Sequence, residues 1–145
     1  MRKWILIKSR RGSSFIKTLA LLSALALFFV FARSFIFVEN DQSRITVTRA
    51  EISHLERSLG IFHLDNGFYP TTKQGLAALV IKPEILPEPL KYDKKGYIKK
   101  IPKDGWKRDF IYRSPGQHGD FDIISFGADG KKGGEGISAD ITNWE

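Results

Sequence analysis

Residues 8–31 read KSRRGSSFIKTLALLSALALFFVF, a cluster of cations followed by a long apolar run. Five Lys and Arg residues precede Gly12, and Lys17 lies inside the apolar side of this boundary. The uncharged part, 18–32, would measure about 22 Å as a helix, short of the roughly 30 Å hydrocarbon core of a bilayer. Extended to 15–38, the helix reaches about 36 Å, and a cation near each end can reach the headgroups. The stretch therefore predicts a transmembrane segment.

A secretory signal peptide would also begin with cations and an apolar run. However, the small-x-small site nearby is Ala24-Leu25-Ala26, and cleavage there would leave the apolar residues 27–31 at the new N-terminus. A buried core helix fits poorly because residues 19–31 are apolar on every side. We therefore expect a retained anchor, and the cation bias places its N-terminus in the cytoplasm.

The net charge of +7 belongs to this N-terminal region. From Glu39 onward, 16 Lys and Arg residues balance 16 Asp and Glu residues. The segment 91–108 holds eight cations and two acids, which we interpret as a solvated face, so no nucleic-acid binding is predicted. The length allows at most one domain with appendages, and the absence of cysteine excludes disulfides and thiol catalysis.

An amphipathic pattern follows Val38. Its apolar residues recur at helical spacing: Ile45, Ile52, Leu55, Leu59 and Phe62. Asn66 and Gly67 tolerate left-handed geometry and Pro70 cannot continue a helix, so we expect one helix to run from the membrane to about Asp65.

The remaining residues predict a small sheet packed on this helix. The segment 71–81 predicts a short helix with Thr72 as its N-cap, and 82–90, with three prolines, predicts an irregular loop. Strand candidates are GYIKKI (96–101), DFIYRS (109–114) and FDIISF (121–126). The fold class is therefore α+β, with about three antiparallel strands.

The sequence lacks a catalytic signature. Its three histidines have no assignable nucleophile, and neither a phosphate-binding Gly-Lys-Ser/Thr loop nor an HExxH motif occurs. We expect the protein not to be an enzyme.

The C-terminal segment 125–145 reads SFGADGKKGGEGISADITNWE and concentrates glycines around Asp129, Glu135 and Asp140. Calcium needs several oxygens from carboxylates and from carbonyls of a freely bending backbone. Spacing alone leaves both a calcium site and a plain solvated loop open.

Three motifs together are specific: YPTTKQGL (69–76), SPGQHG (114–119) and the terminal GADG…GGEG…ADITNW. They resemble the major pseudopilin family of bacterial type II secretion systems over about residues 59–144. The segment GYIKKIPKDGW (96–106) also resembles the family's strand and turn, although Gly105 and Lys107 stand where a Pro and a Gly usually flank the tryptophan.

This resemblance implies a type IV pilin-like fold with four parts: a basic prepilin-type leader (1–12), the transmembrane half of a long helix (13–38), its periplasmic half (39–66) and a globular head (67–145). It implies a structural subunit of the inner membrane, with its C-terminal domain in the periplasm. Such subunits assemble with other pseudopilins on an inner-membrane platform into a pseudopilus that helps to export folded proteins. Leader cleavage and methylation by prepilin peptidase are also implied.

The resemblance further implies a calcium ion in the C-terminal loop. By position, Asp129 and Asp140 would supply side-chain ligands and backbone carbonyls near Ser125 would assist, with Glu135 as a further candidate.

The N-terminus departs from the family pattern. Gly12 matches the cleavage point, but Ser13 holds the position of a usual Phe, and Lys17 holds that of a Glu thought to pair with a neighbouring subunit's N-terminal amine. Opposite charges 4 Å apart gain about 4 kcal/mol at an effective dielectric of 20, and a lysine turns this gain into a repulsion. The alternative is an unprocessed, pseudopilin-like bitopic membrane protein with an accessory or binding role in the periplasm.

Overall fold

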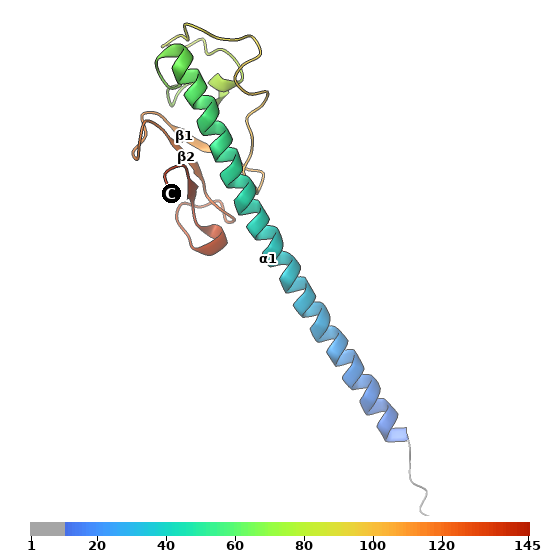
Figure 1. Ribbon diagram of the computed structural model, residues 1–145. Helices are drawn as coiled ribbons and strands as arrows, with labels where there is room; N and C mark the ends of the chain where they lie inside the picture. The colour runs from blue at the N-terminus through green and yellow to red at the C-terminus, as the bar shows by residue number, and fades with distance from the viewer. Residues whose placement is uncertain (1–10) are drawn as a thin grey trace, which may run out of the picture. The chain divides into compact units, whose positions relative to one another are not determined.

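The computed structural model describes residues 11–145, with side chains described for Lys17, 19–31 and 41–145. The chain divides into two compact units, Met1–Asn40 and Asp41–Glu145. Helix α1 (Arg11–Asn66) contributes to both (Figure 1).

The predicted processing site falls at the edge of this description. Residues 1–10 of the leader and the side chain of Ser13 lie outside the described residues, and Gly12 is described only as part of α1. Lys17 is described and is exposed on α1. Among the described residues, no helix combines the length and the apolar character needed to cross a membrane.

The stripe on α1 enters the core of the second unit. Ile52, Leu55, Leu59 and Phe62 are almost fully buried, and Ile45 packs partly against them. Opposite this stripe lie buried apolar residues of the later segments: Leu76, Ala78, Leu79, Ile98, Phe110, Tyr112, Ile123 and Ile141. The predicted helical periodicity is thus confirmed, because the side chains it groups together are those removed from water.

Helix α1 ends at Asn66, one residue beyond the predicted end. Gly67 follows with φ 79° and donates its N–H to the His63 carbonyl at 2.7 Å, a left-handed C-cap that glycine adopts without steric cost. The Asn66 side chain also donates to the Phe62 carbonyl at 2.9 Å. The Gly67 contact satisfies one of the carbonyls that the last turn leaves unpaired, and the Asn66 side chain adds a second hydrogen bond at this end of the helix.

A three-stranded antiparallel sheet in the order β1-β2-β3 packs beside α1 (Figure 1). The strands are short: β1 (Ile111–Arg113), β2 (Asp122–Ser125) and β3 (Ile141–Thr142). Tyr112 pairs with Ile123, and Ser125 pairs with Ile141. These four residues alternate with outward positions and form the face that lies in the core. The α+β class is therefore confirmed.

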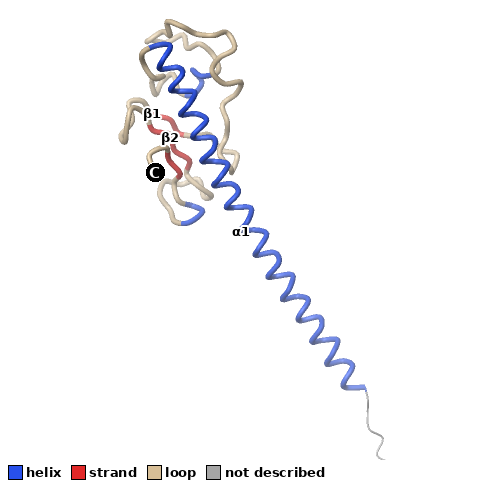
Figure 2. The backbone as a smooth tube through the Cα atoms, in the orientation of Figure 1, coloured by secondary structure: helices blue, strands red, loops and turns tan. Residues whose placement is uncertain are grey.

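Two details of the predicted sheet were wrong. GYIKKI is not a strand, because Tyr97 and Ile98 both donate their backbone N–H groups to the Leu79 carbonyl, at 2.7 and 3.1 Å, and not to the sheet. The third strand is instead β3, which has only two residues and gave no alternating pattern to detect. Figure 2 shows how much of this unit consists of loops and turns between the short strands.

The short helix was placed correctly but capped incorrectly. It is the 3₁₀ helix η1 (Leu76–Leu79), and its N-cap is Gly75. The Thr72 hydroxyl donates to the Ser114 carbonyl at 3.0 Å and so joins two distant segments instead of capping. Residues 82–90 form the predicted irregular loop.

Candidate functional site

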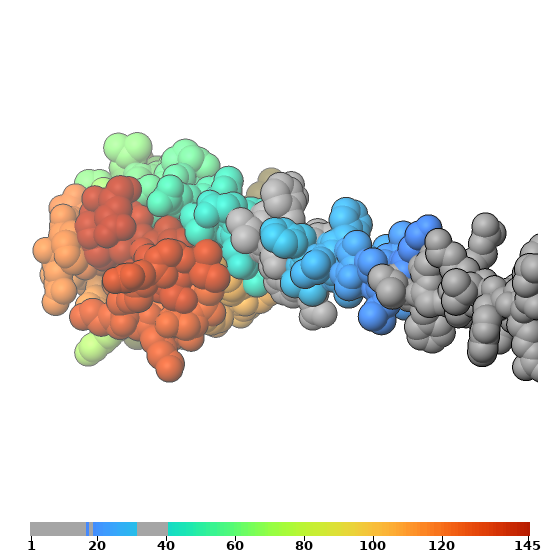
Figure 3. Space-filling model, turned by 90° about the horizontal axis from the view of Figure 1, so that it is seen from below, coloured from blue at the N-terminus to red at the C-terminus, as the bar shows by residue number. Residues whose placement is uncertain are grey.

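The loop between β2 and β3 carries the predicted calcium ligands. It contains the 3₁₀ turn η2 (Gly136–Ser138) and closes on itself through the Ala128 N–H, which donates to the Ile137 carbonyl at 2.9 Å. Gly130 has φ 68°, and a Cβ at that position would collide with the Arg108 guanidinium. The loop backbone is therefore braced by a hydrogen bond of its own and lies against one neighbouring side chain. In the space-filling view of Figure 3, the C-terminal segment, coloured orange to red, covers one face of this unit.

Asp140 and Asp129 are each held by a backbone N–H of the loop. Gly133 donates to Asp140 Oδ2 at 3.0 Å, and Lys131 donates to Asp129 Oδ1 at 2.9 Å. The other carboxylate oxygen of Asp140, Oδ1, is buried without a hydrogen-bond partner. A buried, unpaired carboxylate oxygen is costly unless a cation or donor compensates it. In this respect the loop fits a bound cation.

The other two predicted ligands, Ser125 and Glu135, are not placed like the two aspartates. The buried Ser125 hydroxyl donates to Asp104 Oδ2 at 2.8 Å, which leaves its backbone carbonyl as the group that could face a cation. Glu135 is exposed and precedes η2 as its N-cap residue. Within the described residues, no three His, Cys, Asp or Glu side chains are grouped for metal binding. A cation here would therefore depend on backbone carbonyls, and the ligand set stays a prediction.

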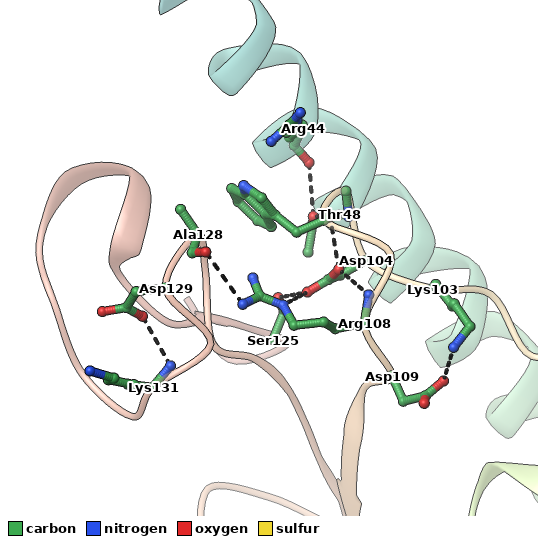
Figure 4. A network of polar contacts seen from close by, with 12 residues as sticks. Arg44, Thr48, Lys103, Asp104, Arg108, Asp109, Ser125, Ala128, Asp129 and Lys131 are labelled. Carbon is green, nitrogen blue, oxygen red and sulfur yellow. Dashed lines mark hydrogen bonds and ion pairs between the residues drawn. The ribbon is translucent and has the colours of Figure 1, made fainter.

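Asp104 organises the turn that supports this loop (Figure 4). It is 2% exposed, and its Oδ1 accepts the backbone N–H groups of Trp106 and Arg108 at 2.9 and 2.8 Å. Its Oδ2 accepts the Ser125 hydroxyl. One carboxylate thus closes the turn and ties it to the last residue of β2, where the loop begins.

Arg108 extends from this turn to the loop (Figure 4). Its Nε lies 3.6 Å from Asp104 Oδ2, and its Nη1 donates to the Ala128 carbonyl at 3.3 Å. The guanidinium carbon lies 5.7 Å from the centre of the Trp106 ring, within range of a cation–π contact. Arg108 Nε and Nη2 are buried without hydrogen-bond acceptors, as is Trp106 Nε1.

The same turn is attached to α1. Thr48 is fully buried on the helix, where its hydroxyl donates to the Arg44 carbonyl at 2.8 Å and accepts the Gly105 N–H at 2.9 Å. A Cβ at Gly105 would collide with the Arg44 backbone, so glycine permits this close approach. A continuous set of contacts thus runs from α1 through the turn to the C-terminal loop.

A second buried carboxylate, Asp122, holds the turn before β2. It accepts the backbone N–H groups of Gln117 and His118 at 2.8 and 3.1 Å, and the His118 ring lies 3.4 Å from Oδ2. Burial alone would raise the pKa of Asp122, but these hydrogen bonds outweigh it and hold the pKa below its usual value. The His118 ring stacks on Trp144 at 3.8 Å, which fixes the chain's C-terminal end.

These side chains border a small cavity on the sheet face that points away from the core. Its volume is about 90 Å³. Its lining includes His118, Asp122, Asp140, Thr142 and Trp144. The Thr142 hydroxyl, like Asp140 Oδ1, is buried without a partner. The cavity therefore joins the Asp122 turn to the edge of the candidate cation loop.

Sequence reasoning missed Asp104, Arg108 and Thr48. The segment 91–108 was interpreted as a solvated face, and its lysines are indeed exposed, but Asp104 is buried. One local pattern could have indicated Asp104. An Asp followed by Gly is typical of an Asx turn, in which the Asp side chain accepts the backbone N–H two residues later, here that of Trp106. The contacts of Arg108 with Ala128 and of Thr48 with Gly105 span 20 and 57 residues and left no trace in spacing.

Comparison with known proteins supports one family. The family model described as type II secretion system (T2SS), protein G matches residues 36–144. The type II secretion system core protein G of Pseudomonas aeruginosa is 47% identical over 105 residues, which cover 72% of this chain and 74% of that protein. The protein of the same name from Vibrio cholerae is 54% identical over 94 residues, which cover 65% of this chain and 64% of that protein.

A solved structure agrees with these sequence matches. The crystal structure of the major pseudopilin from the type 2 secretion system of enterohaemorrhagic Escherichia coli superposes with a TM-score of 0.66 at 42% sequence identity. The match covers 73% of this chain and 87% of that one. The likeness therefore extends over most of the chain.

Proposed function

Since the chain belongs to the type II secretion system protein G family, we propose that it assembles with other copies into a periplasmic pseudopilus that helps to export folded proteins. The chain is a structural subunit, a major pseudopilin, and not an enzyme, as its family and its relatives' names establish. The observation that carries the proposal is the family match over 36–144, which includes all of the helix–sheet core.

The partners follow from this role. A secretion pseudopilin associates with other pseudopilins and with further components of the apparatus. We propose that these include the inner-membrane platform and prepilin peptidase, which would cut after Gly12 and methylate the new N-terminus. The basic leader and the boundary glycine support this step. Ser13 and Lys17 depart from the usual pattern at the positions that follow the cut.

Pseudopilins of this family are generally anchored in the membrane and periplasmic. We propose a single-pass protein of the bacterial inner membrane, with a cytoplasmic N-terminus and a periplasmic C-terminal domain. The support is the apolar stretch 15–38 and the five cations that precede Gly12, because cations accumulate on the cytoplasmic side of membrane segments.

We propose that the C-terminal loop holds a calcium ion. Asp129 and Asp140 would supply carboxylate oxygens, carbonyls near Ser125 would add to them, and Glu135 remains a further candidate. The support is the unpaired, buried Oδ1 of Asp140 and a glycine-rich backbone that can turn its carbonyls inward. A bound cation would neutralise the carboxylates and hold the loop closed.

The proposed role can be tested in the organism that encodes the chain. Deleting its gene should stop type II substrates from reaching the medium, and the wild-type chain should restore their export. Cross-linking should yield ladders of the chain, and N-terminal sequencing of the membrane fraction should begin at Ser13. Restored export without ladders, with full-length chain persisting beside active prepilin peptidase, would support the unprocessed bitopic alternative and overturn this proposal.

Lys17 gives this experiment a matched variant. If its charge opposes a neighbouring N-terminal amine, Lys17→Glu should lengthen the cross-linked ladders because repulsion becomes attraction. Lys8→Glu, which changes the same charge within the leader, is the control. Ladders of equal length for wild type and Lys17→Glu would contradict the charge argument.

A further inference from the structure

We infer that Arg108 is a positioning residue for the C-terminal loop, which it holds in the form that binds the cation. This inference rests on the calcium site proposed above and adds to it a residue outside the ligand set. The observation behind it is that Arg108 contacts the loop on both sides of Asp129: it donates to the Ala128 carbonyl, and its guanidinium lies against Gly130.

The contact is specific in its geometry. Nη1 lies 3.3 Å from the Ala128 carbonyl oxygen. Gly130 has no Cβ, and a Cβ there would meet Nη1, so the guanidinium would have to move away from the turn. The guanidinium therefore fills the space under the turn and fixes the direction of the peptide groups that flank Asp129.

Arg108 is itself held firmly. Its backbone N–H donates to Asp104 Oδ1 and its carbonyl accepts the Asp104 N–H, at 2.8 and 2.9 Å. The Trp106 ring covers one side of the guanidinium. Asp104 also fixes Ser125 through its hydroxyl. The beginning of the loop and the backbone around Asp129 are thus set by one ion pair.

Two donors of the guanidinium, Nε and Nη2, are buried without hydrogen-bond acceptors. Unsatisfied buried donors are uncommon, and here they belong to the group that already holds a loop carbonyl. They can donate hydrogen bonds to further carbonyl oxygens if the loop tightens around an ion. Ligand carbonyls need such support, because a flexible loop must lose conformational freedom before it can bind.

The direction in which the calcium Kd changes when Arg108 is replaced distinguishes a positioning role from a purely electrostatic one. A guanidinium near a calcium site repels the ion, so removing its charge would tighten binding if charge alone mattered. If Arg108 positions the loop, its removal weakens binding despite the lost repulsion. Lysine keeps the charge beside Asp104 but lacks the planar fork that reaches a carbonyl while it pairs with a carboxylate.

The experiment titrates calcium into the metal-free full chain in detergent micelles by calorimetry. It compares wild type with Arg108→Met, Arg108→Lys and the control Lys107→Met, which removes a charge from the exposed neighbouring residue. We expect the Kd to rise about tenfold in both Arg108 variants, consistent with the usual effect of losing a residue that orients metal ligands. The control should stay within twofold. Without calcium, Arg108→Met should melt earlier than wild type because Asp104 loses its counter-charge, whereas Arg108→Lys should melt close to wild type.

Each result decides between the explanations. Wild-type affinity in Arg108→Lys, or tighter binding in Arg108→Met, would overturn positioning and leave calcium binding intact. A folded wild-type chain that binds no calcium would overturn the calcium site and the role of Arg108 with it, without touching the assignment as a pseudopilin subunit. Weaker binding in both Arg108 variants, with an unchanged apo melt in Arg108→Lys, would support the inference.

Discussion

Removing the Asp104 carboxylate should strongly destabilise the head, although it is neither apolar nor a predicted ligand. Three donors converge on it: the backbone N–H groups of Trp106 and Arg108 and the Ser125 hydroxyl, at 2.8–2.9 Å. Arg108 adds an ion pair at 3.6 Å. In Asp104→Ala all of these groups stay in place and lose their acceptor.

The expected cost follows from the number of orphaned donors. Leaving a buried donor unpaired costs about 1–3 kcal/mol, so three donors at the lower end of that range give a loss of about 3–5 kcal/mol. The uncompensated guanidinium adds to this loss, and water entering the space reduces it. A stability loss of this size is a large fraction of the about 5–15 kcal/mol that typically holds a domain together.

The assay is urea unfolding of the full chain in detergent, followed by near-ultraviolet circular dichroism, which reports tertiary packing. Asp109→Ala is the control, because Asp109 pairs with Lys103 at 2.9 Å but its side chain is 79% exposed. An exposed pair contributes about 0–1 kcal/mol, so the control should change little. A loss below about 1 kcal/mol in Asp104→Ala, or equal losses in both variants, would refute the network as a stabilising unit.

Three further predictions concern the same unit. Chelating calcium should lower the melting temperature, because a ligand at a hundred times its Kd adds about 2.7 kcal/mol to the free energy of unfolding. Asp140→Asn should abolish this response, and an unchanged wild-type melting temperature would exclude the site. Lys107→Gly should raise the unfolding free energy by about 1 kcal/mol, because Lys107 has φ 68° and glycine adopts this geometry without strain. In the same urea assay, the control Lys103→Gly should give no gain. Burial raises the pKa of Tyr112 to about 12. The folded state therefore holds this proton more tightly than the unfolded state, and stability should fall by roughly 3 kcal/mol as pH rises from about 10 to 12. Tyr112→Phe should show a shallower fall; equal slopes would contradict the assignment.

The sequence predicted those parts of the fold that depend on periodic burial. Ile52, Leu55, Leu59 and Phe62 share one side of a helix because 3.6 residues complete a turn, and the same four side chains are buried in the core. The end of α1 was predictable because Gly67 adopts the left-handed cap that glycine favours. Both inferences use local chemistry, which neighbouring residues are sufficient to determine.

The sheet was harder because its strands are too short for a pattern. β3 has two residues, and alternation cannot be recognised in so short a segment. GYIKKI alternates more regularly, yet Tyr97 and Ile98 bond to Leu79, and their N–H groups are satisfied away from the sheet. The β-propensity of this segment was therefore overridden by the hydrogen-bond partners that the tertiary fold supplied.

The candidate site likewise has a part that local sequence predicts and a part that depends on the tertiary fold. Glycines and acids close together in sequence indicated the loop, because its own residues supply its flexibility and its carboxylates. Asp104 and Arg108 act on that loop from about 20 residues away, and charge counting placed them on a solvated face. Burial distinguishes Asp104 from the exposed lysines around it, and burial is a property of the fold.

The turn at Asp104 also explains one departure from the family pattern. Lys107 stands where the family resemblance implies a glycine, and its φ of 68° is the geometry that glycine favours. The lysine is tolerated because the Asp104 hydrogen bonds fix the turn from both ends: Lys107 donates to the Asp104 carbonyl at 2.9 Å, and the Asp104 N–H donates to the Arg108 carbonyl. A strained residue persists where its surroundings over-determine the backbone. The substitution therefore costs stability in a place that can bear it.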